Sequence, residues 1–145
     1  MSTSIHHQTL RQIQKHLESA YPHEACGFLL GTQAIGHRHI TSHYEVENRS
    51  TENLRRRFVI DPLDYMRAEK LALQSDKQLL GIYHSHPDHP AIPSVHDLEY
   101  AQPFFSYFIH SIQGGHMTVT RSFRLLDGKL AEEIFTVTKD SRISN

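Results

Sequence analysis

Residues 81–97 restrict the possible fold more than any other part of the chain. An apolar run at residues 79–83 leads into this stretch and predicts a buried strand. His84 and His86 follow two residues apart, and alternate residues of a strand project from the same face, so both imidazoles point to one place. Prolines 87, 90 and 93 then exclude regular structure and stiffen the connection. We therefore predict a strand that carries two converging histidines into a rigid loop.

Ser94 and Asp97 close this stretch at the expected start of a helix. Ser94-x-x-Asp97 alone is a capping box, in which the serine caps the helix and the aspartate lies in its first turn. A helix start also fixes the direction of the Asp97 side chain, so capping and metal binding are compatible. Two histidines and a carboxylate are the ligand set of a catalytic zinc that keeps one open position. We predict one zinc ion per chain, bound by His84, His86 and Asp97.

The histidine pair alone carries little weight, because the chain contains 13 histidines. The full pattern of His-x-His, seven residues and Ser-x-x-Asp arises by chance in roughly one such chain in two hundred. With Glu24 upstream, inside residues 22–31, this pattern resembles the JAMM (MPN-plus, Mov34/JAB) zinc metallopeptidases over about residues 8–137. In its length and in the sequence of its motifs, the chain is most similar to small stand-alone bacterial members of this family. Those members resemble peptidases that trim ubiquitin-like sulfur-carrier proteins.

The resemblance implies a function and a role for each site residue. The expected reaction is hydrolysis of the peptide bond after the C-terminal Gly-Gly tail of a ubiquitin-like sulfur carrier or its conjugate. Glu24 is expected to be the general base that moves a proton from the attacking water to the leaving amine. The Ser94 hydroxyl is expected to donate a hydrogen bond to the oxyanion. The tail is expected to bind extended, alongside an edge strand.

Other functions stay open at this point. An isopeptidase that removes a bacterial ubiquitin-like modifier, or a hydrolase of cell-wall peptides, would use the same residues on a different substrate. A non-catalytic MPN-fold scaffold would share the fold without the chemistry. Cys26 could act as a nucleophile beside a histidine, but it lies in an apolar segment where a small buried thiol is the usual occupant.

Composition predicts an ordinary globular chain of one domain, residues 1–145, in which residues 138–145 form a flexible tail. The net charge of −1 gives no basic field for nucleic acid. Arg55, Arg56 and Arg57 are interpreted as a solvated rim beside the substrate groove. No signal peptide or membrane span is expected, and the single cysteine is typical of a reducing cytoplasm. The pattern leaves the oligomeric state open.

The periodicity of the chain predicts an α/β (α+β) fold with one curved mixed sheet flanked by helices, which is the JAMM/MPN, cytidine-deaminase-like architecture that the resemblance implies. Helices are expected at residues 7–20, 61–75 and 94–102. Strands are expected at residues 25–31, 37–48, 58–60, 79–83, 106–112, 117–125 and 130–137, the last three as a meander. Ser85 should point away from the metal, and His89 or His96 could hydrogen-bond a ligand.

Overall fold

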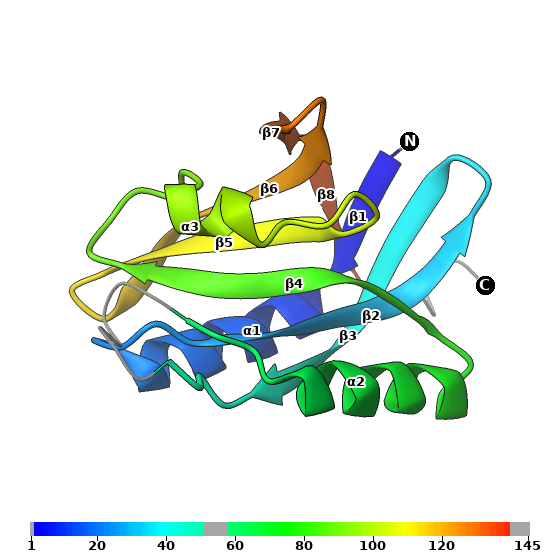
Figure 1. Cartoon of the computed structure of the whole chain (residues 1–145), viewed down its shortest axis with the longest axis horizontal. Helices are drawn as coiled ribbons and strands as arrows, with labels where there is room; N and C mark the ends of the chain where they lie inside the picture. Colours follow the sequence, from blue (N-terminus) through cyan, green and yellow to red (C-terminus); the bar gives the residue numbers. More distant parts are fainter. Residues whose placement is uncertain (1, 51–57, 140–145) are drawn as a thin grey trace.

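The structure, a computed structural model, describes residues 2–50 and 58–139. Eight strands form one sheet in the order β7-β6-β5-β4-β2-β3-β1-β8 (Figure 1). The elements are β1 (Ser2–His6), α1 (His7–Ala20), β2 (Cys26–Ala34), β3 (His37–Val46), α2 (Pro62–Gln74), β4 (Gln78–Pro87), α3 (Val95–Glu99), β5 (Ser106–Gln113), β6 (His116–Leu126), β7 (Lys129–Glu133) and β8 (Phe135–Thr138). No helix among these described residues is long and apolar enough to cross a membrane.

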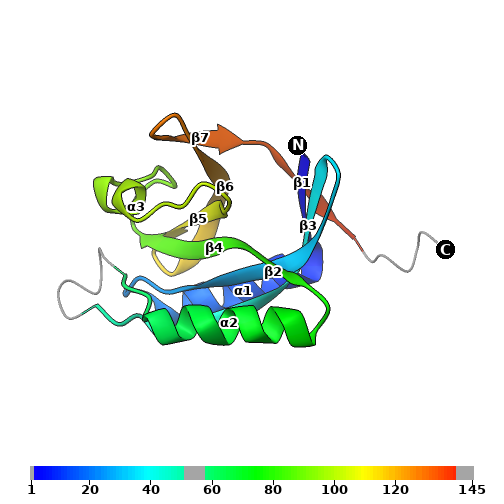
Figure 2. The same cartoon turned by 45° about the vertical axis from the view of Figure 1, so that its right-hand side comes forward.

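The sheet is mixed and strongly curved (Figure 2). β4 pairs in parallel with β5, and β1 pairs in parallel with both β3 and β8. The remaining neighbours are antiparallel, including the β5–β6–β7 meander. Its two turns, Gly114-Gly115 and Asp127-Gly128, have positive φ at both residues, as two-residue hairpins require. The predicted curved mixed sheet flanked by helices is confirmed.

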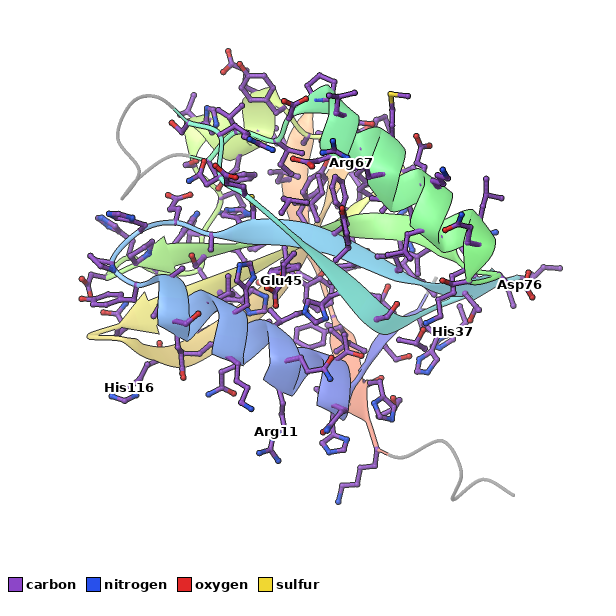
Figure 3. All side chains as sticks on the ribbon, turned by 90° about the horizontal axis from the view of Figure 1, so that it is seen from below. Arg11, His37, Glu45, Arg67, Asp76 and His116 are labelled. Carbon is purple, nitrogen blue, oxygen red and sulfur yellow. The ribbon has the colours of Figure 1, made fainter. Side chains whose placement is uncertain are left out.

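The sheet lies between two helices, α1 on one face and α2 on the other (Figure 3). Alternation along each strand divides the apolar side chains between these two faces. The α1 face buries Ile13, Leu17, Leu29, Tyr83 and Phe108. The α2 face buries Phe28, Leu30, Ala68, Ile82 and Ile109. Each helix therefore covers its own core, and residues adjacent in one strand contribute to different cores.

β4 is buried along nearly its whole length, because both of its faces are covered. Its partners are β2 on one side and β5 on the other. His84 and His86 lie near the C-terminal end of this central strand, as predicted. His84 is thus paired with both β2 and β5, and His86 is paired with β5, which keeps the two ring positions rigid.

Several predicted boundaries were wrong. Residues 58–60 are extended but form no strand, and the third helix covers Val95–Glu99 rather than residues 94–102. The last predicted strand is interrupted at Ile134, where the chain leaves β7 to pair with β1 as β8. β1 was not predicted at all. The arginines at 55–57 and most of the predicted tail, from residue 140 onward, lie outside the described residues.

Candidate metal centre

The three predicted ligands converge on one point. Nε2 of His84 lies 3.1 Å from Nε2 of His86 and 3.2 Å from Oδ1 of Asp97. Nε2 of His86 lies 3.1 Å from Oδ2 of Asp97. Both histidines come from one face of β4, while Asp97 comes from the first turn of α3. Among the described residues this is the one group of three histidine, cysteine or carboxylate side chains with ligand atoms close enough to share an ion.

The geometry and the protonation pattern of this group fit a cation. Three ligands of a tetrahedral zinc ion lie about 3.3 Å from one another, close to the observed separations. Nδ1 of His86 lies 2.9 Å from the carbonyl oxygen of Pro90 and must donate to it. In the neutral ring, Nε2 of His86 therefore presents a lone pair to a second imidazole and a carboxylate. A positive ion between these atoms would turn their mutual repulsion into coordination.

Asp97 is oriented by the capping box that the sequence predicted. Its backbone N–H donates to Oγ of Ser94 at 3.0 Å, and its Oδ2 accepts from the Ser94 backbone N–H at 2.9 Å. Burial raises the pKa of Asp97, but the adjacent His84 and His86 outweigh that effect and hold its pKa well below the usual range. The side chain is therefore a carboxylate with one oxygen directed at each histidine.

His84 is enclosed by aromatic side chains that the sequence interpretation did not assign to the site. The Phe58 ring lies 4.5 Å from the His84 ring, at an interplanar angle of 31°. Nε2 of His96 lies 3.1 Å from the carbonyl oxygen of Phe58. His96 therefore holds Phe58, the residue that covers His84, whereas the sequence had left open a hydrogen bond from His96 to a ligand itself. Nδ1 of His84 is buried without a hydrogen-bond partner among the described residues.

Glu24 lies in the connection between α1 and β2 and is 6% exposed. It lines a hollow of about 330 Å³ together with His86, Ser94 and residues of the loop after β4. Burial raises the pKa of Glu24 to about 8; His86 opposes this rise and Asp97 adds to it. The structure thus brings the predicted base to the same hollow as one ligand and the predicted oxyanion donor.

Ser94 has a hydroxyl proton available in this hollow, because its Oγ acts as an acceptor in the capping box. A second, more apolar hollow has a volume of about 290 Å³, and His84 and Asp97 form part of its wall. Its apolar lining comes mainly from residues 58–60, α2 and β5, including Phe58, Ile60, Tyr65, Tyr107 and Ile109. The three predicted ligands therefore border both hollows, His84 and Asp97 the apolar one and His86 the one that contains Glu24.

Two other residues lie where the sequence predicted. The Ser85 side chain points away from the ligands and its Oγ accepts a hydrogen bond from the Ala25 N–H at 3.0 Å. Cys26 is fully buried, and burial raises the pKa of its thiol above the usual range. A buried neutral thiol is a poor nucleophile. The geometry therefore favours a metal centre over a Cys26-based site.

Comparison with known proteins gives matches along most of the chain. Residues 6–126 match the family model described as prokaryotic homologues of the JAB domain. The CysO-cysteine peptidase of Mycobacterium tuberculosis is 29% identical over 119 residues, which cover 81% of this chain and 79% of that protein. The probable TtuB-protein conjugate cleaving protease of Thermus thermophilus is 36% identical over 72 residues, covering 50% of this chain and 45% of that protein.

The fold is also similar to a solved structure. Protein DSY2949 from Desulfitobacterium hafniense superimposes with a TM-score of 0.84 and is 28% identical. The superposition covers 95% of this chain and 94% of that protein. The likeness therefore extends over the sheet and the helices that carry the three ligands.

Proposed function

The chain belongs to the family of prokaryotic homologues of the JAB domain, and on this premise we propose that it is a zinc-dependent metallopeptidase. The proposed substrate is a ubiquitin-like sulfur-carrier protein, cleaved after its C-terminal Gly-Gly tail. The observation that carries this proposal is the convergence of His84, His86 and Asp97 beside a hollow that also contains Glu24 and Ser94. The mycobacterial relative, a CysO-cysteine peptidase, supports the substrate class.

Each side chain has a defined task in the proposed reaction. Zinc bound by His84, His86 and Asp97 supplies Lewis-acid chemistry and lowers the pKa of water. Glu24 takes a proton from the attacking water and delivers it to the leaving nitrogen as the C–N bond breaks. The Ser94 hydroxyl donates to the carbonyl oxygen as negative charge develops there. The hydrogen bond to Pro90 keeps His86 in the tautomer that binds metal through Nε2.

The protonation of Glu24 suits this task. Burial alone favours the neutral acid, which is why its pKa lies near 8. A nearby cation favours the carboxylate and lowers that value toward neutrality, where a group can both accept and return a proton.

The two hollows support cleavage within a chain rather than binding of a compact small molecule. A peptide that crosses the three ligands would place residues on both sides of the scissile bond, one side in each hollow. The larger apolar wall, formed by residues 58–60 and α2, suits apolar side chains of a carrier tail.

The Thermus relative supports a second candidate reaction, the cleavage of an isopeptide bond. That protein is named as a probable protease that cleaves a protein conjugate, which supports an isopeptidase activity that uses the same residues. The two reactions differ in the leaving group: an α-amine in carrier trimming and a lysine ε-amine in conjugate cleavage. A carrier with a C-terminal extension and the same carrier linked to a lysine are therefore the discriminating pair of substrates.

The direct test is intact-mass analysis of both substrates before and after incubation with zinc-loaded protein. Loss of the extension, prevented by a zinc chelator and by Glu24→Gln, is the result we expect. Cleavage of the lysine-linked substrate alone would replace carrier trimming by isopeptidase activity. No cleavage of either substrate, with one zinc bound per chain, would contradict the proposed function.

A further inference from the structure

The side chain of Asn48, just after β3, connects two segments that are distant in sequence. Its Nδ2 donates to the carbonyl oxygen of Glu24 at 3.1 Å. Its Oδ1 accepts from the backbone N–H groups of Ser50 and Val59, each at 3.0 Å. A carboxamide is the one side-chain group that offers a donor and an acceptor in this arrangement with no net charge. Asn48 therefore joins the connection that contains Glu24 to the segment that contains Val59.

The segment around Val59 continues directly to the metal ligands. The backbone N–H of Arg49 donates to the Val59 carbonyl oxygen at 2.9 Å, which reinforces the link made by Asn48. The preceding residue, Phe58, covers the ring of His84. Its carbonyl oxygen accepts a hydrogen bond from Nε2 of His96 at 3.1 Å. A short path of hydrogen bonds and one ring contact thus connects the backbone of Glu24 with a ligand.

Glu24 depends on such contacts because it lies outside regular secondary structure. The residue before it, His23, donates its backbone N–H to Ala20 at 2.9 Å, and the residue after it, Ala25, is held by Ser85. Asn48 binds the carbonyl of Glu24 itself. A general base must be held to within about 0.5 Å of its productive position, and side-chain freedom alone would not fix the backbone that carries it.

We propose that Asn48 is a positioning residue that holds the backbone of Glu24 in register with residues 58–60, and so aligns the base with the ligands. This inference rests on the role proposed above for Glu24. Asn48 contacts no reacting atom in this scheme. Its effect on catalysis passes through the position of Glu24 alone.

The substitution Asn48→Asp distinguishes the hydrogen bond that Asn48 donates to Glu24 from those that it accepts from Ser50 and Val59. The aspartate keeps an acceptor for Ser50 and Val59 but loses the N–H group that binds Glu24, and it turns a negative oxygen toward that carbonyl. Asn48→Ala removes both kinds of hydrogen bond. Thr9→Val is the matched control, because it removes another buried hydrogen bond, from Thr9 Oγ1 to the Thr41 carbonyl at 2.8 Å, on the α1 side of the sheet.

We expect Asn48→Asp to bind zinc as the wild type does and to keep KM within about twofold. Its kcat, compared at the pH optimum of each protein, should fall by about ten- to a hundredfold, the effect of a small displacement of a catalytic group. In a Glu24→Gln background the same substitution should cause no further loss, because the base is already absent. Thr9→Val should lower stability and leave kcat unchanged.

An equal loss in both backgrounds would overturn the proposal, since Asn48 would then act on the fold or the metal. Unchanged kcat in Asn48→Asp would overturn it too. If the wild type cleaves no carrier, the positioning role of Asn48 can still be tested by NMR, which needs no substrate. The ¹³C chemical shift of the Glu24 carbonyl should change in Asn48→Asp and stay unchanged in Thr9→Val. The backbone amides of Ser50 and Val59 should show faster hydrogen exchange in Asn48→Ala only. An unmoved Glu24 resonance would contradict the positioning role independently of the proposed reaction.

Discussion

Gly27 lies directly against the ring of Tyr83, its partner across the β2–β4 ladder. A β-carbon added at Gly27 would fall 2.4 Å from the Tyr83 ring. Tyr83 is fully buried, and its hydroxyl lies 2.8 Å from Nδ1 of His16 on α1. The residue after Tyr83 is the ligand His84, on the opposite face of the strand. The absence of a side chain at Gly27 thus provides the space that keeps β4 in its position.

Gly27→Ala should therefore destabilise the protein by about 1–3 kcal/mol, the usual cost of overpacking a core. Urea unfolding measures this change. In a Tyr83→Leu background, which empties the space, the alanine should cost less than it does in the wild type. Equal costs in the two backgrounds would show that the Tyr83 ring is not the obstacle.

The roles of Glu24 and the ligands are separable by metal analysis. Glu24→Gln should retain zinc and lose about a hundred- to ten-thousandfold in kcat, because proton transfer is removed without removing a ligand. His84→Ala and Asp97→Ala should lose both zinc and activity. Zinc is measured by mass spectrometry on dialysed protein. Normal turnover by zinc-replete Glu24→Gln would exclude Glu24 as the base.

Ser94 has two tasks, and two substitutions distinguish them. Ser94→Ala loses the helix cap, at a cost of about 1 kcal/mol, and the proposed oxyanion donor, which should lower kcat about a hundred- to a thousandfold. Ser94→Thr keeps a hydroxyl for both tasks and should retain most activity. Steady-state kinetics with denaturant unfolding resolves the two effects. Full activity of Ser94→Ala would remove the hydroxyl from the mechanism.

Zinc should stabilise the fold because its ligands come from two elements, β4 and α3. Binding to the native state alone adds about 4 kcal/mol at a free zinc concentration a thousandfold above Kd. Thermal unfolding with and without a chelator should show this difference in the wild type and in Glu24→Gln. His84→Ala should show almost none. Equal zinc stabilisation of His84→Ala would place the ion elsewhere.

His110 should make stability fall in acid. Burial, with smaller contributions from His84 and His86, lowers its pKa to about 3, whereas an unfolded histidine titrates near 6.5. Below that pH the unfolded chain binds a proton that the native state does not, so stability declines as pH falls from about 6.5 toward 3. Between pH 7 and 5 the loss is about 2 kcal/mol.

The matched variant for this effect is His110→Gln, which cannot titrate. The difference in unfolding free energy between the two proteins, measured at the same zinc loading, should change by that amount across the interval. A constant difference would mean that the pKa of His110 is the same in the native and unfolded states, and a change of opposite sign would mean that its native pKa is raised. The metal ligands titrate in both the wild type and His110→Gln, so their contribution to the pH dependence cancels in the difference between the two proteins.

Local spacing was enough to predict the three ligands, since strand alternation aligns His84 with His86 and a helix cap directs Asp97. Glu24 came from family resemblance, because nothing in its local sequence distinguishes it from a turn residue. Phe58 and Asn48 were missed for a physical reason: their roles depend on contacts between segments 24 to 38 residues apart. Spacing within one element carries no information about such contacts.

β1 was missed because its buried residues are mostly polar. Thr3 and Ser4 are almost fully buried, yet they carry no apolar signal. Thr3 donates to Glu133, and Ser4 contacts the ring of His39. Arg38 likewise is fully buried and donates to the carbonyl of Leu80 and to Ser106. Hydropathy patterns report burial of apolar groups and cannot detect polar side chains whose partners satisfy them inside the fold.

The pairing of β1 with β8 sets an order on how this sheet can be completed. The Thr3–Glu133 hydrogen bond spans 130 residues of sequence, and contacts of that separation are entropically late in folding. During synthesis, β2 and β3 can form their hairpin early, while β1 must wait for residues 135–138 to leave the ribosome before its second neighbour exists. β1 is therefore among the last strands to be fully paired, although it precedes β2 in the chain, and the two histidines on β4 can be brought together before it.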